Sequence, residues 1–138
     1  MPAEKEAALS ETSLSSLKDC SRILVFDEDL HILHSSFQVQ QAELQPLTAL
    51  FGDREQAIRN GMKIDGKRYE VHRHHPPLVY GRSMTEEPEH SEGAAVCKEE
   101  RGVQGKPMYS VITYQMPNVS ARMVELLRQF SEQHLRAK

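Results

Sequence analysis

Apolar residues alternate with polar ones, or run together, along most of the chain. Residues 22–26 read RILVF, an apolar run of strand-forming residues that ends at the acidic turn of residues 27–29. Residues 30–34 follow with alternating polarity. This pattern predicts a β-hairpin formed by the two segments.

Two short helices are predicted after this hairpin. In residues 41–51 the apolar side chains recur at helical spacing, and Pro46 fits only in the first turn because an interior proline breaks a helix. In residues 53–60 the helix has a natural N-cap in Asp53 and a natural stop in Gly61.

A second hairpin is predicted around the Asp65-Gly66 pair, which suits a type I′ turn. Its strands are residues 62–64 and 67–74. Strict alternation along the second strand puts three side chains on one face: Tyr69, Val71 and Arg73. The opposite face then carries Arg68, Glu70, His72 and His74.

Three more strands are predicted in the second half of the chain, at residues 78–80, 93–98 and 108–115. A polar, acidic loop at residues 83–92 separates the first two. A glycine-containing loop at residues 99–107, which we expect to be mobile, separates the last two. Because tight turns join most of the strands, the sheet is predicted to be antiparallel.

The last predicted element is a long C-terminal helix, capped by Asn118 or Ser120. Its apolar face is formed by Val119, Met123, Leu126, Leu127, Phe130 and His134. The element order predicts an α+β fold in which helices pack against an antiparallel sheet. We expect one domain, residues 1–138, in which residues 1–20 form a weakly ordered helix or tail.

Charge and composition argue against several classes of function. The net charge is −3, whereas a general nucleic-acid binder needs a concentrated positive field. No apolar run approaches the roughly 20 residues that span a bilayer, and the N-terminal residues lack the apolar segment of a secretory signal. We therefore expect a cytoplasmic, monomeric protein in which Cys20 and Cys97 stay reduced.

Residues 22–127 resemble the profilin family in the order and spacing of four motifs. The motifs are ILVFDEDLHILHSS, AIRNGMKIDGKRYEVHR, LVYGR and GAAVCK. The resemblance implies a profilin-like central antiparallel sheet with the terminal helices on one side and the short helices on the other. It also implies a protein that binds actin monomers and associates with the cytoskeleton.

Profilins bind actin through their middle strands and the start of the C-terminal helix. The resemblance places five residues on that face: Arg68, Arg73, Arg82, Arg122 and Glu125. Long cationic side chains on a rigid sheet can steer and anchor an acidic partner. Because strict alternation separates Arg68 from Arg73, a bulge or a strong twist is needed to bring both to one surface.

Two departures from the family pattern imply weaker actin binding. The loop at residues 115–118 is shorter than the family pattern and lacks its glycine, and Ala121 stands where asparagine is common. The acidic loop that follows Arg82 acts in the same direction, because its carboxylates repel an acidic partner.

A second profilin activity is the binding of proline-rich segments by aromatic rings from the terminal helices and the adjacent strand. This sequence has no tryptophan, and Leu33 occupies the position that resembles the family's strand tryptophan. The C-terminal residues HLRAK lack the family's late tyrosine. Because leucine cannot supply ring stacking, we expect this activity to be weak or absent.

A third profilin activity is the binding of acidic phospholipids. The basic residues that resemble such a patch are Lys63, Lys67, Arg68, Arg73 and Arg82. Each charge near an anionic surface is worth about 1 kcal/mol. An alternative function is therefore a phosphoinositide- or acidic-phospholipid-binding module, or an adaptor, that has lost actin binding.

Metal and catalytic sites are poorly supported by the sequence. His72, His74 and His75 lie close together, but no cysteine or carboxylate stands beside them at ligand spacing. No nucleophile motif or phosphate-binding glycine loop is present. Cys97 is interpreted as a small core residue. We expect no cofactor, no metal and no enzymatic activity; a small hydrolase remains an alternative only if Cys97 or His72 has a shifted pKa in a pocket.

Overall fold

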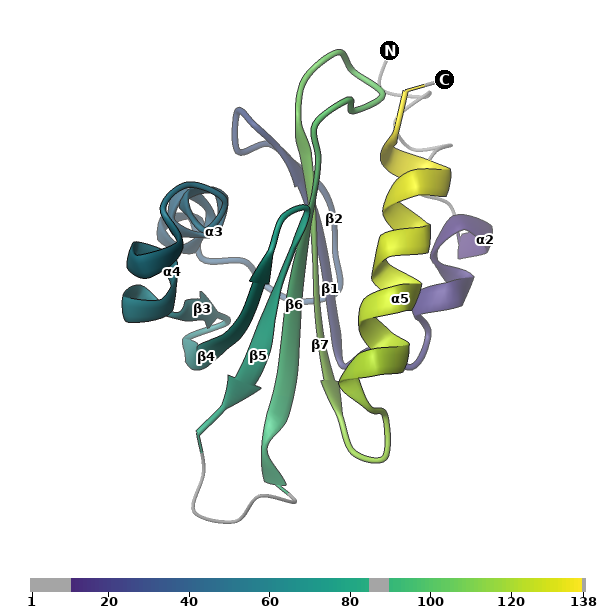
Figure 1. Ribbon diagram of the computed structural model, residues 1–138. Coiled ribbons are helices and arrows are strands. Elements are labelled where there is room, and N and C mark those ends of the chain that lie inside the picture. Colours follow the sequence, from purple (N-terminus) through teal and green to yellow (C-terminus); the bar gives the residue numbers. More distant parts are fainter. Residues whose placement is uncertain (1–10, 85–89, 138) are drawn as a thin grey trace.

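The computed structural model describes residues 11–84 and 90–137. At its centre lies an antiparallel sheet with the strand order β2-β1-β7-β6-β5-β4-β3 (Figure 1). The strands are β1 (Arg22–Asp27), β2 (Ile32–Ser35), β3 (Met62–Ile64), β4 (Lys67–His75), β5 (Leu78–Ser83), β6 (Glu92–Glu99) and β7 (Met108–Gln115). The predicted antiparallel arrangement is confirmed.

Helices cover both faces of the sheet (Figure 1). One face, which we call the α4 face, carries η2 (Gln41–Glu43), α3 (Leu44–Ala49) and α4 (Arg54–Asn60). The other, the α5 face, carries α2 (Glu11–Leu14), η1 (Ser15–Leu17), α5 (Ser120–Phe130) and its continuation η4 (Ser131–Leu135). This is the predicted α+β arrangement, with terminal helices opposite the short ones. Within the described ranges, no helix has the length and apolar character required to cross a membrane.

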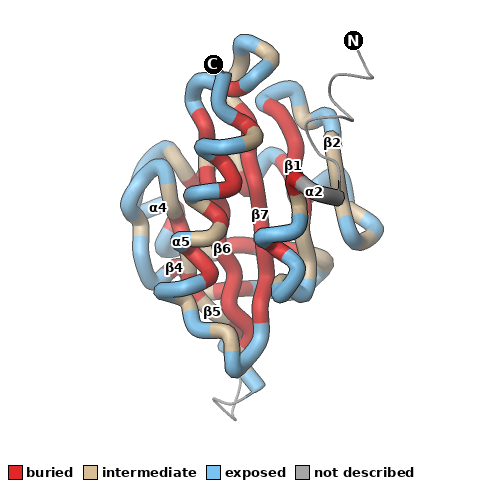
Figure 2. The backbone as a smooth tube through the Cα atoms, turned by 90° about the vertical axis from the view of Figure 1, so that its right-hand side faces the viewer, coloured by how far each residue is buried: buried red, intermediate tan, exposed pale blue. Residues whose placement is uncertain are grey.

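Each face has its own hydrophobic core. Successive residues of a strand point to opposite faces, so Leu24 of β1 packs in the α4-face core and Val25 in the α5-face core. The central strands β6 and β7 are covered on both sides and are buried along most of their length (Figure 2). They form a rigid middle on which the outer strands and α5 are mounted.

The N-terminus of α4 confirms the capping prediction. The Asp53 carboxylate accepts a hydrogen bond from the backbone N–H of Gln56 at 3.1 Å. Gly61 ends the helix with a φ of 70°, a conformation that glycine adopts without steric cost. The Asp65-Gly66 turn likewise has positive φ at both residues, as the predicted hairpin requires.

Replacing Asp53 with alanine is expected to lower the free energy of unfolding by about 1 kcal/mol, because the N–H of Gln56 loses its acceptor. Chemical denaturation measures this change. Asp53→Asn keeps an acceptor oxygen and should lie within a few tenths of a kcal/mol of the wild type. Equal stability of Asp53→Ala and the wild type would contradict the capping role.

Two strand boundaries differ from the prediction by more than one residue. β2 begins at Ile32 rather than at residue 30, because Leu30 takes a φ of 68° and belongs to the turn. β5 continues to Ser83 instead of ending at residue 80, since it stays paired with β4 and β6. Residues 85–89 of the predicted acidic loop lie outside the described residues.

The start of α5 also differs from the prediction. Val119 precedes the helix and no side chain caps it, so neither predicted cap is correct. The Ser120 hydroxyl instead accepts a hydrogen bond from the Tyr114 hydroxyl at 2.8 Å. Val119 is 50% exposed and does not belong to the buried face of the helix.

The predicted mobile loop between β6 and β7 is bonded to the end of the chain. The N–H of Val103 donates to the carbonyl of Leu135 at 2.8 Å, and the N–H of Ala137 donates to the carbonyl of Arg101 at 2.6 Å. These bonds fix the loop against the end of η4.

A buried polar network holds the start of β6 in place. The Glu92 carboxylate, with a side chain only 3% exposed, accepts hydrogen bonds from Arg22 at 2.7 Å, from Gln115 at 3.2 Å and from the Tyr69 hydroxyl. Arg22 also donates to Asp65 at 3.0 Å. A buried carboxylate is stable only when it is paired in this way. The network therefore ties β6 to β1, β4 and the β3–β4 turn.

Candidate functional site

A β-bulge in β4 places Arg73 on the α5 face. Val71 pairs with Gly81 and Arg73 pairs with Tyr80, so His72 is an extra residue in the strand. Tyr80 packs against the α5-face core, and paired residues point to the same face. The prediction from alternation, that Arg73 shares the face of Val71, is therefore wrong.

Gly81 makes this local geometry possible. A Cβ atom at this position would lie 1.6 Å from the carbonyl oxygen of Glu70 on β4. No other residue can occupy the site without moving backbone. The glycine in the LVYGR motif thus lets β5 approach β4 closely beside the bulge.

Arg68 lies on the α5 face by register, but its guanidinium is already engaged. It pairs with Lys63 across the β3–β4 hairpin, so both point to the face that Arg73 occupies. The Nη2 atom of Arg68 donates to the carbonyl of Arg59 near the end of α4 at 3.2 Å. This contact directs the charge toward the outer end of the hairpin.

Arg82 joins three elements at the open part of the α5 face. Its Nε donates to the Ser91 hydroxyl at 2.9 Å and its Nη2 to the Ser91 carbonyl at 3.1 Å. Its Nη1 lies 3.5 Å from the hydroxyl of Ser120, the first residue of α5. The structure thus brings Arg82 to the start of the C-terminal helix.

Arg122 turns in a different direction. Its Nη2 forms an ion pair with Asp19, just after η1, at 2.8 Å, and its Nη1 donates to Asn118 at 3.0 Å. Glu125, the predicted acidic residue of α5, forms an ion pair with Arg128 of the same helix. The hydrogen bond from Arg128 lowers the pKa of the Glu125 carboxyl.

The predicted residues thus fall into two groups. The surface that we call the β4–β5 face consists of Arg73, Leu78, Tyr80, Arg82, Val124 and Glu125. Leu78, Tyr80 and Val124 are partly or largely buried and form an apolar centre. Charged side chains surround it, an arrangement that protein-binding surfaces share. Arg68 and Arg122 instead direct their charges to α4 and to Asp19.

The predicted phospholipid set is also divided. Lys67 pairs with Ile64, which is buried on the α4 face, and its Nζ lies 3.9 Å from Glu92. It therefore points away from the α5 face. The register places the other members on that face: Lys63, Arg68, Arg73 and Arg82.

No exposed aromatic ring lies on the described parts of the terminal helices. Leu14, Leu17 and Leu33 pack in or against the α5-face core where the family resemblance would place rings. Phe130, the aromatic residue of α5, is fully buried. A proline-rich ligand would meet aliphatic side chains on this surface.

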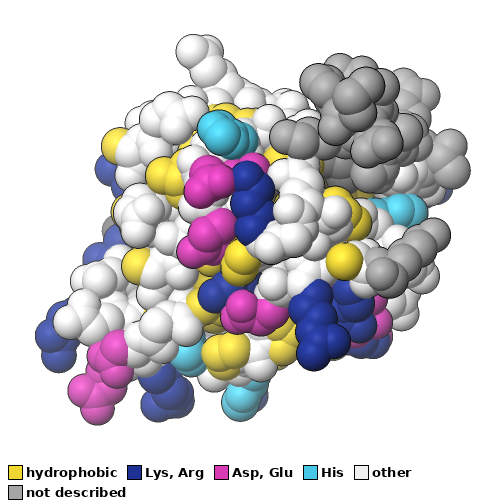
Figure 3. Space-filling model, turned by 90° about the horizontal axis from the view of Figure 1, so that it is seen from above, with side chains coloured by type: hydrophobic (Ala, Val, Ile, Leu, Met, Phe, Trp, Pro, Cys, Tyr) yellow, Lys and Arg dark blue, Asp and Glu magenta, His cyan; other side chains and the backbone are white. Residues whose placement is uncertain are grey.

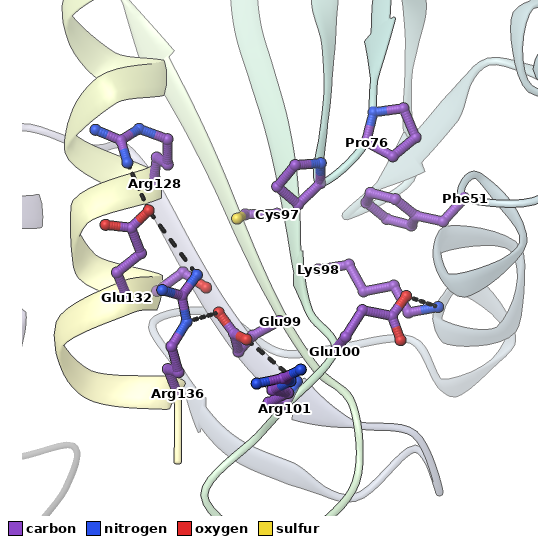
Figure 4. Close-up of a pocket in the computed structure, with 12 residues that line it drawn as sticks. Phe51, Pro76, Cys97, Lys98, Glu99, Glu100, Arg101, Arg128, Glu132 and Arg136 are labelled. Carbon is purple, nitrogen blue, oxygen red and sulfur yellow. Dashed lines mark hydrogen bonds and ion pairs between the residues drawn. The ribbon is translucent and has the colours of Figure 1, made fainter. Parts of the chain in front are cut away.

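A cavity of about 550 Å³ lies between α5 and the turn at Pro76 (Figure 4). Along its α5 side, Arg128 and Arg136 both pair with Glu132. Figure 3, viewed from above, shows basic and acidic side chains intermixed rather than in separate patches. Burial raises the pKa of the Cys97 thiol on the cavity wall to about 11, the opposite of what a nucleophile needs.

The three histidines of β4, His72, His74 and His75, do not gather at one site. The Nε2 of His74 lies 2.7 Å from the Leu50 carbonyl on the α4 face, whereas His72 and His75 are exposed. Cys97 and His72 therefore do not support the hydrolase alternative.

Sequence reasoning missed one group of possible metal ligands in the β1–β2 turn. Ligand atoms of Asp27, Asp29 and His31 lie within 4.8 Å of one another. The Nζ of Lys106 is 2.6 Å from Asp29 and 3.3 Å from Asp27, so an ammonium group balances the carboxylates. The Asp-x-Asp-x-His spacing of residues 27–31 is the sequence signal that could have identified this group.

Comparison with known families identifies the family of the chain. The profilin family model matches residues 7–103 of the sequence. The chain belongs to the profilin family. No curated protein sequence matches it significantly.

Solved structures similar to this profilin share its fold at low sequence identity. Profilin II of Acanthamoeba castellanii is 18% identical and superposes with a TM-score of 0.70, covering 88% of this chain and 90% of the other. The profilin of Schizosaccharomyces pombe gives the same four values. LokiProfilin1, in its complex with rabbit actin, is 11% identical with a TM-score of 0.69, covering 96% and 95%.

Proposed function

We propose that this profilin binds monomeric actin through the β4–β5 face and acts as a non-catalytic regulator of the cytoskeleton in the cytoplasm. The observation that carries the proposal is the bulge at His72, which places Arg73 and Arg82 on one face. Neither guanidinium forms an ion pair with a carboxylate among residues 11–84 and 90–137. Two similar structures, LokiProfilin1 and LokiProfilin2, were solved in complexes with rabbit actin, which supports the same partner here.

The proposal includes weak affinity. The charge of Arg122 is paired with Asp19, and the guanidinium of Arg68 is directed toward α4, so two of the four expected arginines do not offer an unpaired charge on the β4–β5 face. Long-range attraction to an acidic partner depends on charges that are not already neutralised.

Titration of fluorescently labelled monomeric actin with the purified protein tests this function. We expect saturable binding that weakens as ionic strength rises, because the face presents guanidinium groups that pair with no carboxylate in the described ranges. Absence of saturable binding at low ionic strength would refute the proposed function.

Binding of a proline-rich peptide is expected to be absent at micromolar concentrations. The described terminal helices offer leucines where ring stacking is needed, so a polyproline II helix gains no aromatic platform. Fluorescence anisotropy of a labelled oligoproline measures the affinity. A dissociation constant in the micromolar range would contradict this prediction.

The second candidate function is binding of acidic phospholipids, which Lys63, Arg73 and Arg82 on the α5 face favour. Lys63→Glu is expected to weaken binding to vesicles that contain phosphoinositides by about tenfold or more, because one attraction is replaced by a repulsion. Arg54→Glu is the matched control and should change binding little, since Arg54 is exposed at the start of α4 on the opposite face. Equal effects of the two substitutions in vesicle sedimentation would argue against this patch. Vesicle binding without actin binding would favour the lipid-binding or adaptor alternative.

A further inference from the structure

Arg82 is held at three points, and no carboxylate in the described part of the chain pairs with it. All three hydrogen-bond acceptors are uncharged oxygens: the Ser91 hydroxyl, the Ser91 carbonyl and the Ser120 hydroxyl. Glu70 pairs with Arg82 across the strands, but the guanidinium turns instead toward Ser91 and α5. The group is therefore fixed in position without an ion pair to any carboxylate among the described residues.

Two other predicted arginines each lack either a fixed position or an unpaired charge, and Arg68 is held by one hydrogen bond that directs it to α4. Arg122 is fixed, but its charge is paired with Asp19. Arg73 has no ion pair with a carboxylate of residues 11–84 and 90–137, but no hydrogen bond within these ranges holds it. A guanidinium that is already oriented loses less side-chain entropy on binding, and its planar donors match a carboxylate. Arg82 combines both advantages.

We propose that Ser91 and Ser120 are positioning residues that orient Arg82 to bind a carboxylate of the partner. This inference rests on the proposed actin-binding function and assigns the chemistry of one contact within it. Ser91, which directly precedes β6, holds Nε and Nη2, and Ser120 links Nη1 to α5. Tyr114 donates its hydroxyl hydrogen to Ser120 and so orients the hydroxyl of that serine.

The substitution Ser91→Ala tests the positioning role, because the Ser91 hydroxyl bonds to Arg82 and can be removed without leaving a buried charge. We expect actin binding to weaken about threefold to tenfold, as the loss of one hydrogen bond to a charged group predicts. Ser91→Thr keeps the hydroxyl and should restore binding. Thr48→Ala, which removes a hydroxyl bonded locally in α3, is the matched control and should have no effect.

The substitution Ser91→Asp distinguishes the effect of the position of Arg82 from the effect of its charge. A carboxylate at this position keeps Arg82 in place but pairs with its guanidinium. We expect Ser91→Asp to weaken actin binding as strongly as Arg82→Gln, without loss of thermal stability. Actin binding by Ser91→Asp that equals the wild type would overturn the claim that an unpaired Arg82 contacts a carboxylate.

A measurement on the protein without actin tests the positioning role of the two serines independently of actin binding. Nuclear magnetic resonance can follow exchange of the Arg82 Nε–H with water, which the Ser91 hydroxyl should slow. Ser91→Ala and Ser120→Ala are expected to accelerate this exchange, whereas Thr48→Ala is not. If the wild type fails to bind actin, the proposed function fails and this exchange alone decides the positioning role. Unchanged exchange in both serine variants would overturn it.

Discussion

Gly81→Ala is expected to lower the free energy of unfolding by about 3 kcal/mol. The new Cβ atom would stand 1.6 Å from the carbonyl oxygen of Glu70, and because both are close to backbone, no side-chain rotation relieves the overlap. β5 must move away from β4 beside the bulge, which also displaces Arg73 from the β4–β5 face. Chemical denaturation and actin titration should therefore both report a loss.

Gly52→Ala is the matched control for this substitution. Its Cβ atom would meet only the carbonyl oxygen of Ala49, at an ordinary 3.4 Å, and Gly52 does not have positive φ. We expect its stability to stay within about 0.5 kcal/mol of the wild type. Equal stabilities of Gly81→Ala and Gly52→Ala would mean that the close approach of β4 and β5 is not required.

Arg73→Glu is expected to weaken actin binding by at least about tenfold, because a positive charge on the β4–β5 face becomes negative. Its side chain is exposed and has no hydrogen bond to a described residue, so folding should not be affected. The difference from the wild type should shrink as salt is added, since exposed charges are screened. Actin titration at two salt concentrations measures both effects.

Arg122→Gln tests whether Arg122 contributes to actin binding, as the family resemblance implies, or is withheld by its ion pair with Asp19. The Arg122 guanidinium is already paired with Asp19, so removing its charge should change actin affinity less than about threefold. If Arg122→Gln weakened binding as much as Arg73→Gln, the charge of Arg122 would be available to the partner despite its pairing. The division of the predicted site into two groups would then be wrong.

Much of the fold was predictable because local signals and packing agree. The Asp53 cap, the Gly61 stop and the Asp65-Gly66 turn all lie where the sequence places them. At these positions a side chain or a glycine specifies the backbone without help from distant residues. The side chains of β1 likewise pack alternately in the two cores, because successive residues of a strand point to opposite faces of the sheet.

The site was harder to predict because distant contacts decide it. A bulge adds one residue and reverses every later side chain in a strand, and no residue type in β4 announces it. The pairing of Arg122 with Asp19 joins residues about a hundred positions apart in sequence, and the anchoring of Arg82 depends on a serine from a neighbouring strand start. Residue types identified the candidate cations, but only the register and the ion pairs show which charges remain available.

The central claim, that actin binds the β4–β5 face, is tested most directly by mapping the contact on isotope-labelled protein. Nuclear magnetic resonance spectra with and without unlabelled monomeric actin should show the strongest signal loss at Arg73, Tyr80, Arg82 and the first turns of α5. Signals of Leu17, Leu33 and α4 should change least. Strongest signal loss at α4, or on the surface formed by η1 and β2, would contradict the account.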